Sequence, residues 1–592
     1  MKIYYLLIFI IIKSLSINAN EQDSETINLH TSPNLDQLVL EHNELENKKL
    51  QEQDSDQTKL EEVSDTNLES SEIAIEESIN EEVLEKNSNF ISISNPVEIE
   101  NYLNNLKNIK SNILKNELFN LLESSNFDFN QKNNRDIFYS IIKFFYETGN
   151  ISKAYNLLKT KNFQDDERLN YYTMIELNYL LSTFQLQNVC NIKNTISKEL
   201  IIDYFLLEKL DIFCLILEDN LAEAELLNTI IIESENILDE NFQKLYIMIL
   251  NEDNMENEKL NLNKNINSDL IFLYSAMARI AELPLDENFL RVDPKNLSIP
   301  IILNQSSPMD VRIKAATDSY LEEIISIESL SALYQSVDFN SDQLNNSDKT
   351  IEDLSDNPEL LMAYYFQLIN VQIFPSERIE ALMNFWKYAK TINLEEVAYS
   401  LSYKIVETIK MSSENLNFGP EISTSYIFNK DYEKALGWID FYEQNMKIDE
   451  KSTHVRSLLN LHSATEVDFF LDLIQNYLNT DKNNVKINEE LKFILISILD
   501  KDLNAQLSSN YENIFDERLM PSMFLIQNID DAVQNKNNDK FLIFSILSLS
   551  DKNWIEIHPE HLKILLNGYI DYKNGIFLKE IIMDIFEDYK IL

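Results

Sequence analysis

The sequence predicts an all-α protein, built as an irregular solenoid of helical hairpins in two blocks behind a disordered acidic N-terminal segment. Five glycines and eleven prolines among 592 residues leave few tight turns for β-hairpins. Apolar residues recur at spacings of three and four, the period of amphipathic helices. A chain of this length exceeds one compact core, whereas stacked repeats add core as they add length.

The clearest helical hairpin spans residues 137–158. An apolar helical stripe ends at a polar turn containing Gly149, which can enter the left-handed conformation at little steric cost. Asn150 or Ser152 can then cap the amides of a second helix. Small Ala154 would allow the two helices to approach closely. Neither helix can bury its stripe alone, so such a unit is expected to stack on its neighbours.

Residues 1–19 read as a signal peptide. Lys2 precedes ten apolar residues, 3–12, which suffice for export but are too few to span a bilayer. Ala19 would be the last residue removed, so the mature protein is expected to be soluble in the periplasm. Lys13 interrupts the usual pattern and leaves an uncleaved anchor as the alternative.

Residues 20–92 are predicted to form a disordered linker. Positions 20–89 hold twenty acidic residues, four lysines and no aromatic residue, too little apolar surface to offset chain entropy. A tether between the export signal and the folded body is the favoured role. A calcium-buffering role is disfavoured because no EF-hand spacing is present, and a tail for a basic partner is the other alternative.

The helical body is predicted as block 1 (93–283) and block 2 (309–592), joined by a Pro-rich connection (284–308). Four of the eleven prolines fall in that connection, so we expect extended chain there. A loop is expected at 411–422, around Gly419-Pro420. The stretches with the strongest helical period are 103–122, 169–184, 200–217, 222–232, 360–374, 376–391, 395–409 and 575–592.

Weaker copies of the hairpin turn occur at 219–227, 393–399 and 429–436. Each has a polar turn and then a small residue early in a second helix, which resembles the helix-B start of tetratricopeptide (TPR) repeats. Ala154 and Ala224 are 70 residues apart, about two such repeats. The full Trp-Leu-Gly-Tyr pattern of that family is absent, and no fixed period is expected along the chain.

The export signal, the helix restart at 312–316 and the helix at 435–438 also resemble those of uncharacterised exported helical-repeat proteins of alphaproteobacteria. This resemblance implies a compartment and a fold class. It implies no chemistry.

The glycine positions exclude several enzyme classes. Five scattered glycines provide neither a dinucleotide fingerprint, nor a phosphate loop, nor a nucleophile elbow. Soluble lytic transglycosylases, which are also exported helical proteins, carry a catalytic Glu-Ser region with no convincing counterpart; the nearest pair, Glu69-Ser70, lies in the acidic segment. A net charge of −49 disfavours nucleic acids and anionic lipid surfaces as partners.

Cys190 and Cys214 are the only cysteines, and an even number in an oxidising compartment is compatible with a disulfide. They fall near the end of one helical run and within the next, where neighbouring helices could bring them together. The alternative is two small buried apolar side chains.

His558-Pro559-Glu560-His561 places two imidazoles three positions apart. Metal binding would need further ligands, so a helix-start or surface role is favoured. The three tryptophans, Trp386, Trp438 and Trp554, lie on helical stripes and are expected in the core.

The sequence therefore predicts an exported scaffold that binds a protein or peptide partner in a groove between stacked helices. We expect no catalytic residues, cofactor, metal, nucleic-acid partner or stable membrane insertion. The alternatives are an envelope assembly or structural factor held by an uncleaved anchor, and an enzyme on cell-wall or glycan material that lacks a short motif.

Overall fold

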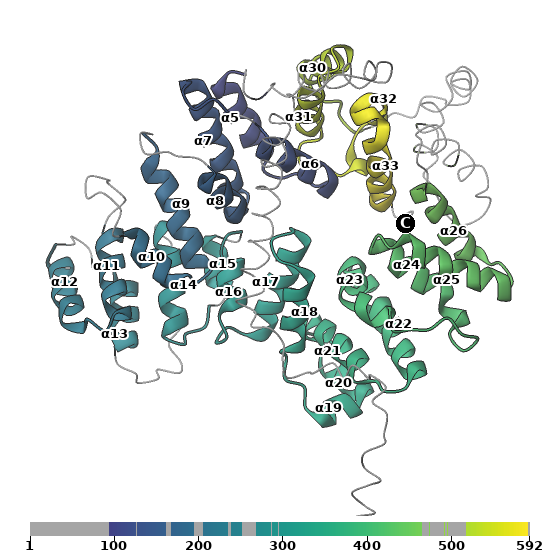
Figure 1. The fold of residues 1–592 in the computed structure, drawn as a ribbon, viewed down its shortest axis with the longest axis horizontal. Coiled ribbons are helices and arrows are strands. Elements are labelled where there is room, and N and C mark those ends of the chain that lie inside the picture. Colours follow the sequence, from purple (N-terminus) through teal and green to yellow (C-terminus); the bar gives the residue numbers. More distant parts are fainter. Residues whose placement is uncertain are drawn as a thin grey trace, which may run out of the picture.

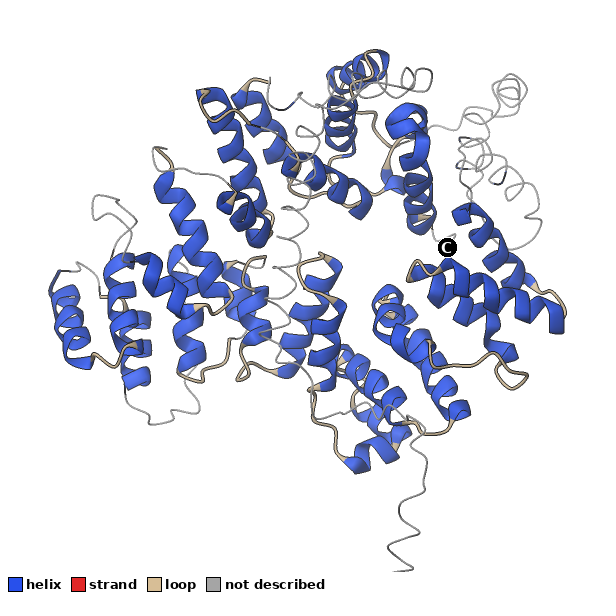
Figure 2. Ribbon diagram, in the orientation of Figure 1, coloured by secondary structure: helices blue, strands red, loops and turns tan. Residues whose placement is uncertain are grey.

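The computed structural model describes residues 91, 94–125, 127–160, 167–193, 205–234, 238–250, 268–285, 287–293, 295–463, 473, 491, 494 and 517–589. Over these residues the chain is all-α and contains no strand (Figure 2). The signal peptide expected at 1–19 and nearly all of the acidic segment expected at 20–92 lie outside the described residues. Within the described part, no helix is both long and apolar enough to cross a membrane.

The helices confirm the periodic stretches as helical where these are described, with a break in 103–122 between α5 and α6. Their bounds are α5 (Pro96–Asn105), α6 (Asn112–Glu123), α7 (Lys132–Glu147), α8 (Ile151–Lys159), α9 (Leu169–Ser182), α10 (Leu186–Lys193), α11 (Leu206–Leu217), α12 (Leu221–Ser234), α13 (Glu240–Leu250), α14 (Ser268–Ile280), α15 (Glu287–Val292), α16 (Ser298–Leu303), α17 (Met309–Leu321), α18 (Ile327–Gln335), α19 (Ser341–Asn345), α20 (Ser347–Asp353), α21 (Pro358–Val371), α22 (Pro375–Thr391), α23 (Glu395–Val406), α24 (Gly419–Phe428), α25 (Tyr432–Asn445), α26 (Glu450–Ser463), α30 (Met523–Gln534), α31 (Asn538–Leu549), α32 (Pro559–Asp571) and α33 (Ile576–Asp588), with short 3₁₀ turns at 416–418, 554–556 and 572–575.

One turn geometry recurs among the described residues, and in six helical hairpins the second helix begins two residues after the left-handed position of this turn. In the first, Gly149 has φ +88°, its amide donates to the Tyr146 carbonyl, and the next amide, of Asn150, donates to the Phe145 carbonyl at 2.8 Å. This is a Schellman closure, which satisfies two carbonyls at the end of a helix. The left-handed residues of the six turns are Gly149, Phe184, Asp219, Asn393, Lys430 and Lys536, and the hairpins are α7–α8, α9–α10, α11–α12, α22–α23, α24–α25 and α30–α31.

The fifth residue after each left-handed position is buried in all six hairpins. Its amide donates to the carbonyl of the residue just before the second helix, so it sits in the first turn of that helix, against the first helix. A small residue there allows close approach of the pair. Phe541 is the large exception, and Gly568 of α32 provides room for its ring. The six residues are Ala154, Val189, Ala224, Ala398, Ala435 and Phe541.

The hairpins repeat with a constant period in one part of the chain. The left-handed residues Gly149, Phe184 and Asp219 succeed one another at intervals of 35 positions. The expectation that no fixed period holds is therefore wrong for these three hairpins. The middle hairpin, α9–α10, was not predicted from the sequence. Its left-handed residue is Phe184, and a bulky residue with positive φ is uncommon at such a turn.

The Pro-rich segment 284–308 is not extended chain, which corrects the sequence prediction. It contains α15 and α16, and α16 packs against α17 with all six of its residues buried. Pro300 is the third residue of α16, where the missing amide hydrogen would have had no partner within the helix anyway. The prolines therefore limit helix length here without preventing helix formation.

Two further local predictions are wrong. Gly419 and Pro420 begin α24 instead of lying in a loop, with Pro420 in the first turn. Neither Asn150 nor Ser152 caps α8 through its side chain. The Asn150 side-chain amide instead donates to the hydroxyl of Thr148 at 3.2 Å, which reinforces the turn itself.

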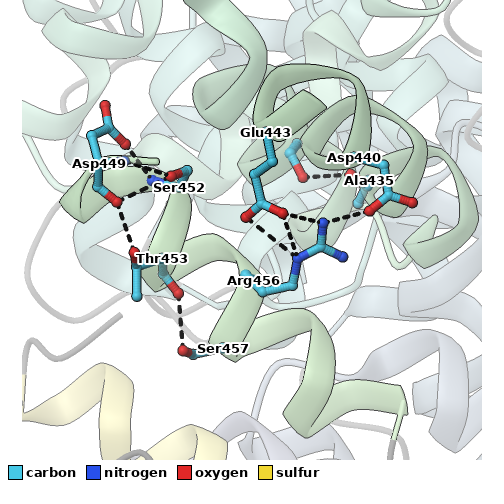
Figure 3. A network of polar contacts seen from close by, with 9 residues as sticks. Ala435, Asp440, Glu443, Asp449, Ser452, Thr453, Arg456 and Ser457 are labelled. Atoms are coloured by element: carbon cyan, nitrogen blue, oxygen red, sulfur yellow. Dashed lines mark hydrogen bonds and ion pairs between the residues drawn. The ribbon is translucent and has the colours of Figure 1, made fainter. Parts of the chain in front are cut away.

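Charged side chains fix α26 onto α25, as Figure 3 shows. Arg456 lies between Asp440 and Glu443 of α25 and donates to both, at 2.6 Å to Glu443 Oε2. Asp449 caps α26 by accepting from the Ser452 amide at 2.8 Å. This network orients the last helix before residue 464.

The two ends of the described chain lie side by side. Figure 1 shows α30–α33, in yellow, next to α5 and α6, in purple, and α31 contacts both α5 and α6 while α33 contacts α6. Ser111 donates to Asp584 at 2.5 Å and Tyr572 donates to Glu117 at 2.8 Å. The array therefore returns on itself.

Candidate binding cavity

An open cavity of about 820 Å³ lies where four separate parts of the chain meet. Its wall comes from the α5–α6 connection and α6 (106–119), the end of α7 and its turn (144–149), the segment 295–324 around α16 and α17, and the turn after α31 (551–556). The first two of these parts are close together in the sequence, whereas the other two are far from them and from each other. Only the return of the C-terminal helices onto α6 completes the cavity.

The α7–α8 turn positions one wall of this cavity. Gly149 packs so closely on Lys295 that a Cβ added to the glycine would lie 2.6 Å from Lys295 Cβ. Asn296 donates through its side chain to the Tyr146 carbonyl at 3.0 Å, an acceptor at the end of α7. Asp293 stabilises this loop, because its carboxylate accepts a hydrogen bond from the Asn296 backbone amide at 3.0 Å. Lys295 is thereby presented at the cavity wall.

Four lysines line the cavity in a chain that has about twice as many acids as bases. Lys107 pairs with Glu147 at 2.7 Å, and Lys115 pairs with Glu322. Lys110 and Lys295 are exposed and have no ion-pair partner among the described residues. The acids of the lining are Asp318, Glu322, Asp551 and Glu556.

Lys115 is surrounded by other charged groups and by an aromatic ring. Burial lowers its pKa, and the nearby positive charges of Lys295 and Lys153 lower it further, while Glu323 opposes the shift. Its ammonium lies 5.7 Å from the centre of the buried Phe119 ring, and Lys153 lies 5.9 Å from the same ring. The positive charges of Lys115, Lys153 and Lys295 therefore lie near one another, while the whole lining has four lysines and four acids.

A buried hydroxyl at the cavity wall lacks a partner. Ser319 of α17 is 2% exposed, and its Oγ makes no hydrogen bond among the described residues. An unsatisfied buried hydroxyl costs about 1–3 kcal/mol. Burial also raises the pKa of the neighbouring Asp318, with Lys314 opposing the shift.

The two ends of the described chain contact each other beside the cavity, where Ser111 and Trp554 are next in sequence to residues of its lining. Trp554 donates through its indole to Asp584 at 2.6 Å and through its backbone to Asp588 at 2.7 Å. Burial raises the pKa of both carboxyls, against the hydrogen bonds that stabilise their charged forms. Ser111, the N-cap of α6, donates to the same oxygen of Asp584.

The two cysteines singled out from the sequence are not part of the cavity lining and are joined in the structure. Cys190 of α10 and Cys214 of α11 form a disulfide with a Cα–Cα separation of 5.7 Å. The bond lies within the array of 35-residue hairpins, where it connects the second hairpin to the third.

His558 and His561 take different places at the start of α32. His558 is the N-cap, and its Nδ1 accepts from the Glu560 amide at 3.2 Å. Pro559 occupies the first helical position, so the predicted helix start is confirmed. His561 is buried, hydrogen-bonds to Ser548 at 2.8 Å, and has a pKa lowered to about 4 by burial. Among the described residues no cluster of His, Cys, Asp and Glu could hold a metal ion.

The tryptophans confirm the core prediction: Trp386, Trp438 and Trp554 are all buried. Sequence reasoning missed the lysine-lined cavity entirely. Lys107, Lys110 and Lys115 form a small basic group before and within α6, which was the only signal available, and Lys295 joins it solely through the fold.

Neither a family model, nor a curated protein, nor a solved structure matches this chain.

Proposed function

We propose that this chain is an exported helical-repeat scaffold that binds short segments of other proteins, with the lysine-lined cavity as one binding site. The hairpin repeat supports the proposal. Its 35-residue interval, and the small residue five positions after the left-handed residue, resemble features of TPR repeats, which bind peptides between stacked helices. The first 19 residues support export to the periplasm.

The observation that carries the proposal is that Lys110 and Lys295, which have no ion-pair partner among the described residues, both line a cavity large enough for a few residues of peptide. A free C-terminal carboxylate or an acidic side chain would pair with them. The polar side chains Asn108, Asn112 and Asn553 at the wall would bind the peptide backbone.

Fluorescence anisotropy would test this function with a fluorescein-labelled pool of Asp- and Glu-rich hexapeptides that end in free carboxylates. We expect K110Q/K295Q to weaken binding by about tenfold or more, as the loss of a charged hydrogen bond does. The matched control is K349Q/K387Q, which removes two exposed lysines outside the cavity and should leave affinity within twofold.

The same pool with amidated ends separates the two anionic groups. Weaker binding of the amidated pool would place the terminal carboxylate in the cavity, and equal binding would assign the lysines to acidic side chains. Equal affinity of the wild type and K110Q/K295Q for both pools would refute the cavity as a peptide site. N-terminal sequencing of protein from the exported fraction tests the compartment, with Asn20 as the expected first residue.

A further inference from the structure

Apolar side chains are exposed along α12, and none of them lines the cavity. Leu226 is 61% exposed and Ile230 is 49% exposed. We define the α12 surface as Leu221, Leu226, Ile230 and Ile232, all of them exposed.

The helical period places these residues on the outer sides of α12. Ala224, Asn228 and Ile231 form its buried face, and α12 packs on α11. Leu226 and Ile230 are four residues apart and therefore share a face, on the side away from that buried stripe. Figure 1 shows α12 at the outer edge of the molecule, with α11 on its inner side.

Helix α13 lies on the buried side of α12. The side chains of Asn228 and Gln243 exchange two hydrogen bonds, at 2.9 and 2.7 Å, between α12 and α13, and Asn228 belongs to the buried face of α12. The outer face that carries Leu226 and Ile230 is therefore provided by α12 itself, on the side away from α13.

A helix at the outer edge of a helical array normally has a polar outer face, because no further hairpin covers it. In α12 the apolar residues surround the helix, which is typical of a helix buried on more than one side. Exposed groups of large apolar side chains on soluble proteins mark interaction sites. The α12 surface thus has the composition of a covered face.

The charges around this surface restrict what can cover it. Residues 205–250 contain ten acidic side chains and two lysines, and one of these, Lys209, is buried in an ion pair with Asp239 at 2.7 Å. Glu223, Glu225 and Glu233 of α12 are exposed beside the leucines and isoleucines. Like-charge repulsion disfavours an anionic lipid surface, and also a second copy of a chain with net charge −49.

We propose that the α12 surface binds a basic amphipathic helix of a partner protein. The apolar face of that helix covers Leu226 and Ile230, and its lysines or arginines pair with the glutamates of α12 beside them. This is helix recognition through apolar contacts at helical spacing, with charge setting partner choice. It is independent of the cavity and gives one chain two sites of opposite charge preference.

The probe is an 18-residue peptide of leucine and lysine arranged at helical period, labelled with fluorescein. The control peptides are a scrambled version of the same composition, which has no apolar face, and a version with glutamate in place of lysine. Anisotropy with the full chain should show binding of the first peptide only, and the affinity should fall as salt rises. Binding of the scrambled peptide with equal affinity would overturn the proposal, because charge alone would then explain the interaction.

Paired variants locate the site. L226Q/I230Q should weaken peptide binding by about tenfold or more, while I373Q/F374Q, a matched change at two exposed apolar residues before α22, should leave it within twofold. Both sites are exposed, so both variants should fold, which circular dichroism checks. Equal losses in the two variants, or no loss in L226Q/I230Q, would refute the site.

A photo-cross-linking residue at position 226 would show whether the peptide, another part of the same chain or a second copy of the chain covers the α12 surface. Cross-linking to the leucine–lysine peptide, competed by the unlabelled peptide, is the expected result. A cross-link within the same chain or to a second copy, unaffected by the peptide, would show that this protein covers its own surface and would overturn the proposal.

Discussion

Replacing Gly149 by alanine should loosen the α7–α8 hairpin and the wall of the cavity together. Gly149 has φ +88°, a conformation that costs an L-residue roughly 1–2 kcal/mol. An alanine Cβ would also lie 2.6 Å from Lys295 Cβ, a separation that requires the two segments to move apart. Overpacking of this kind costs typically about 1–3 kcal/mol. We therefore expect a local destabilisation of about 2–5 kcal/mol.

Hydrogen exchange read by mass spectrometry is the appropriate assay, because it reports local opening in a long array. The Gly149 and Asn150 amides donate to carbonyls of α7, so peptides covering 141–158 should exchange about 30- to 5,000-fold faster. G437A is the control, since Gly437 is helical and only the flexible end of Met411 approaches it, at 3.2 Å. That variant should be neutral or stabilised by up to about 1 kcal/mol.

The double variant G149A/K295G separates the two causes. Removing the Lys295 side chain should recover the steric part of the loss and leave the conformational part. G149N tests the conformational part, because asparagine tolerates the left-handed region better than alanine does. Exchange within twofold of the wild type in G149A would refute the reasoning, as would an equal acceleration in G437A.

Three further predictions follow from the turns, the buried histidine and the disulfide. K536G should slow exchange in α30 and α31 about fivefold, because an exposed lysine occupies a left-handed position that glycine adopts without cost; unchanged or faster exchange would contradict this. His561 has a folded-state pKa of about 4, below its unfolded value, so its neutral form stabilises α32 above pH 6.5 and this stability is lost as the pH falls toward 4. The loss reaches about 2 kcal/mol at pH 5, measured as faster exchange in 538–571, and H561Q should remove this pH dependence. Reducing Cys190–Cys214, which encloses a sequence separation of 24 residues, should cost about 3 kcal/mol; mass spectrometry without reduction that detects two free thiols in protein from the exported fraction would show that the bond does not form there.

Local interactions made much of the fold predictable from sequence. The helices follow from apolar residues at spacings of three and four, and the turn at 149 follows from a glycine between two such stripes. The hairpin starts at 219, 393 and 430 were predictable for the same reason, because turn and helix start lie within one short stretch. Phe184 and Lys536 escaped notice because the surrounding fold imposes the left-handed conformation on residues that do not prefer it.

Sequence reasoning failed where the answer depended on distant parts of the chain. The prolines of 284–308 suggested extended chain, yet α16 forms because burial against α17 stabilises a six-residue helix that would not persist alone. The His558–His561 spacing could not distinguish a ligand pair from a cap and a core residue. Burial and the Ser548 partner decided that question.

The sequence by itself therefore determined the helical hairpins, their closure at Gly149 and the burial of Ala154, because each depends on residues within a few turns of one another. The tertiary structure alone decided that the chain ends meet at Ser111 and Asp584 and that Lys110 and Lys295 share one cavity. Helical period specifies which face of each helix is buried. It carries no information about which distant helix covers that face, and the cavity exists only where those distant helices meet.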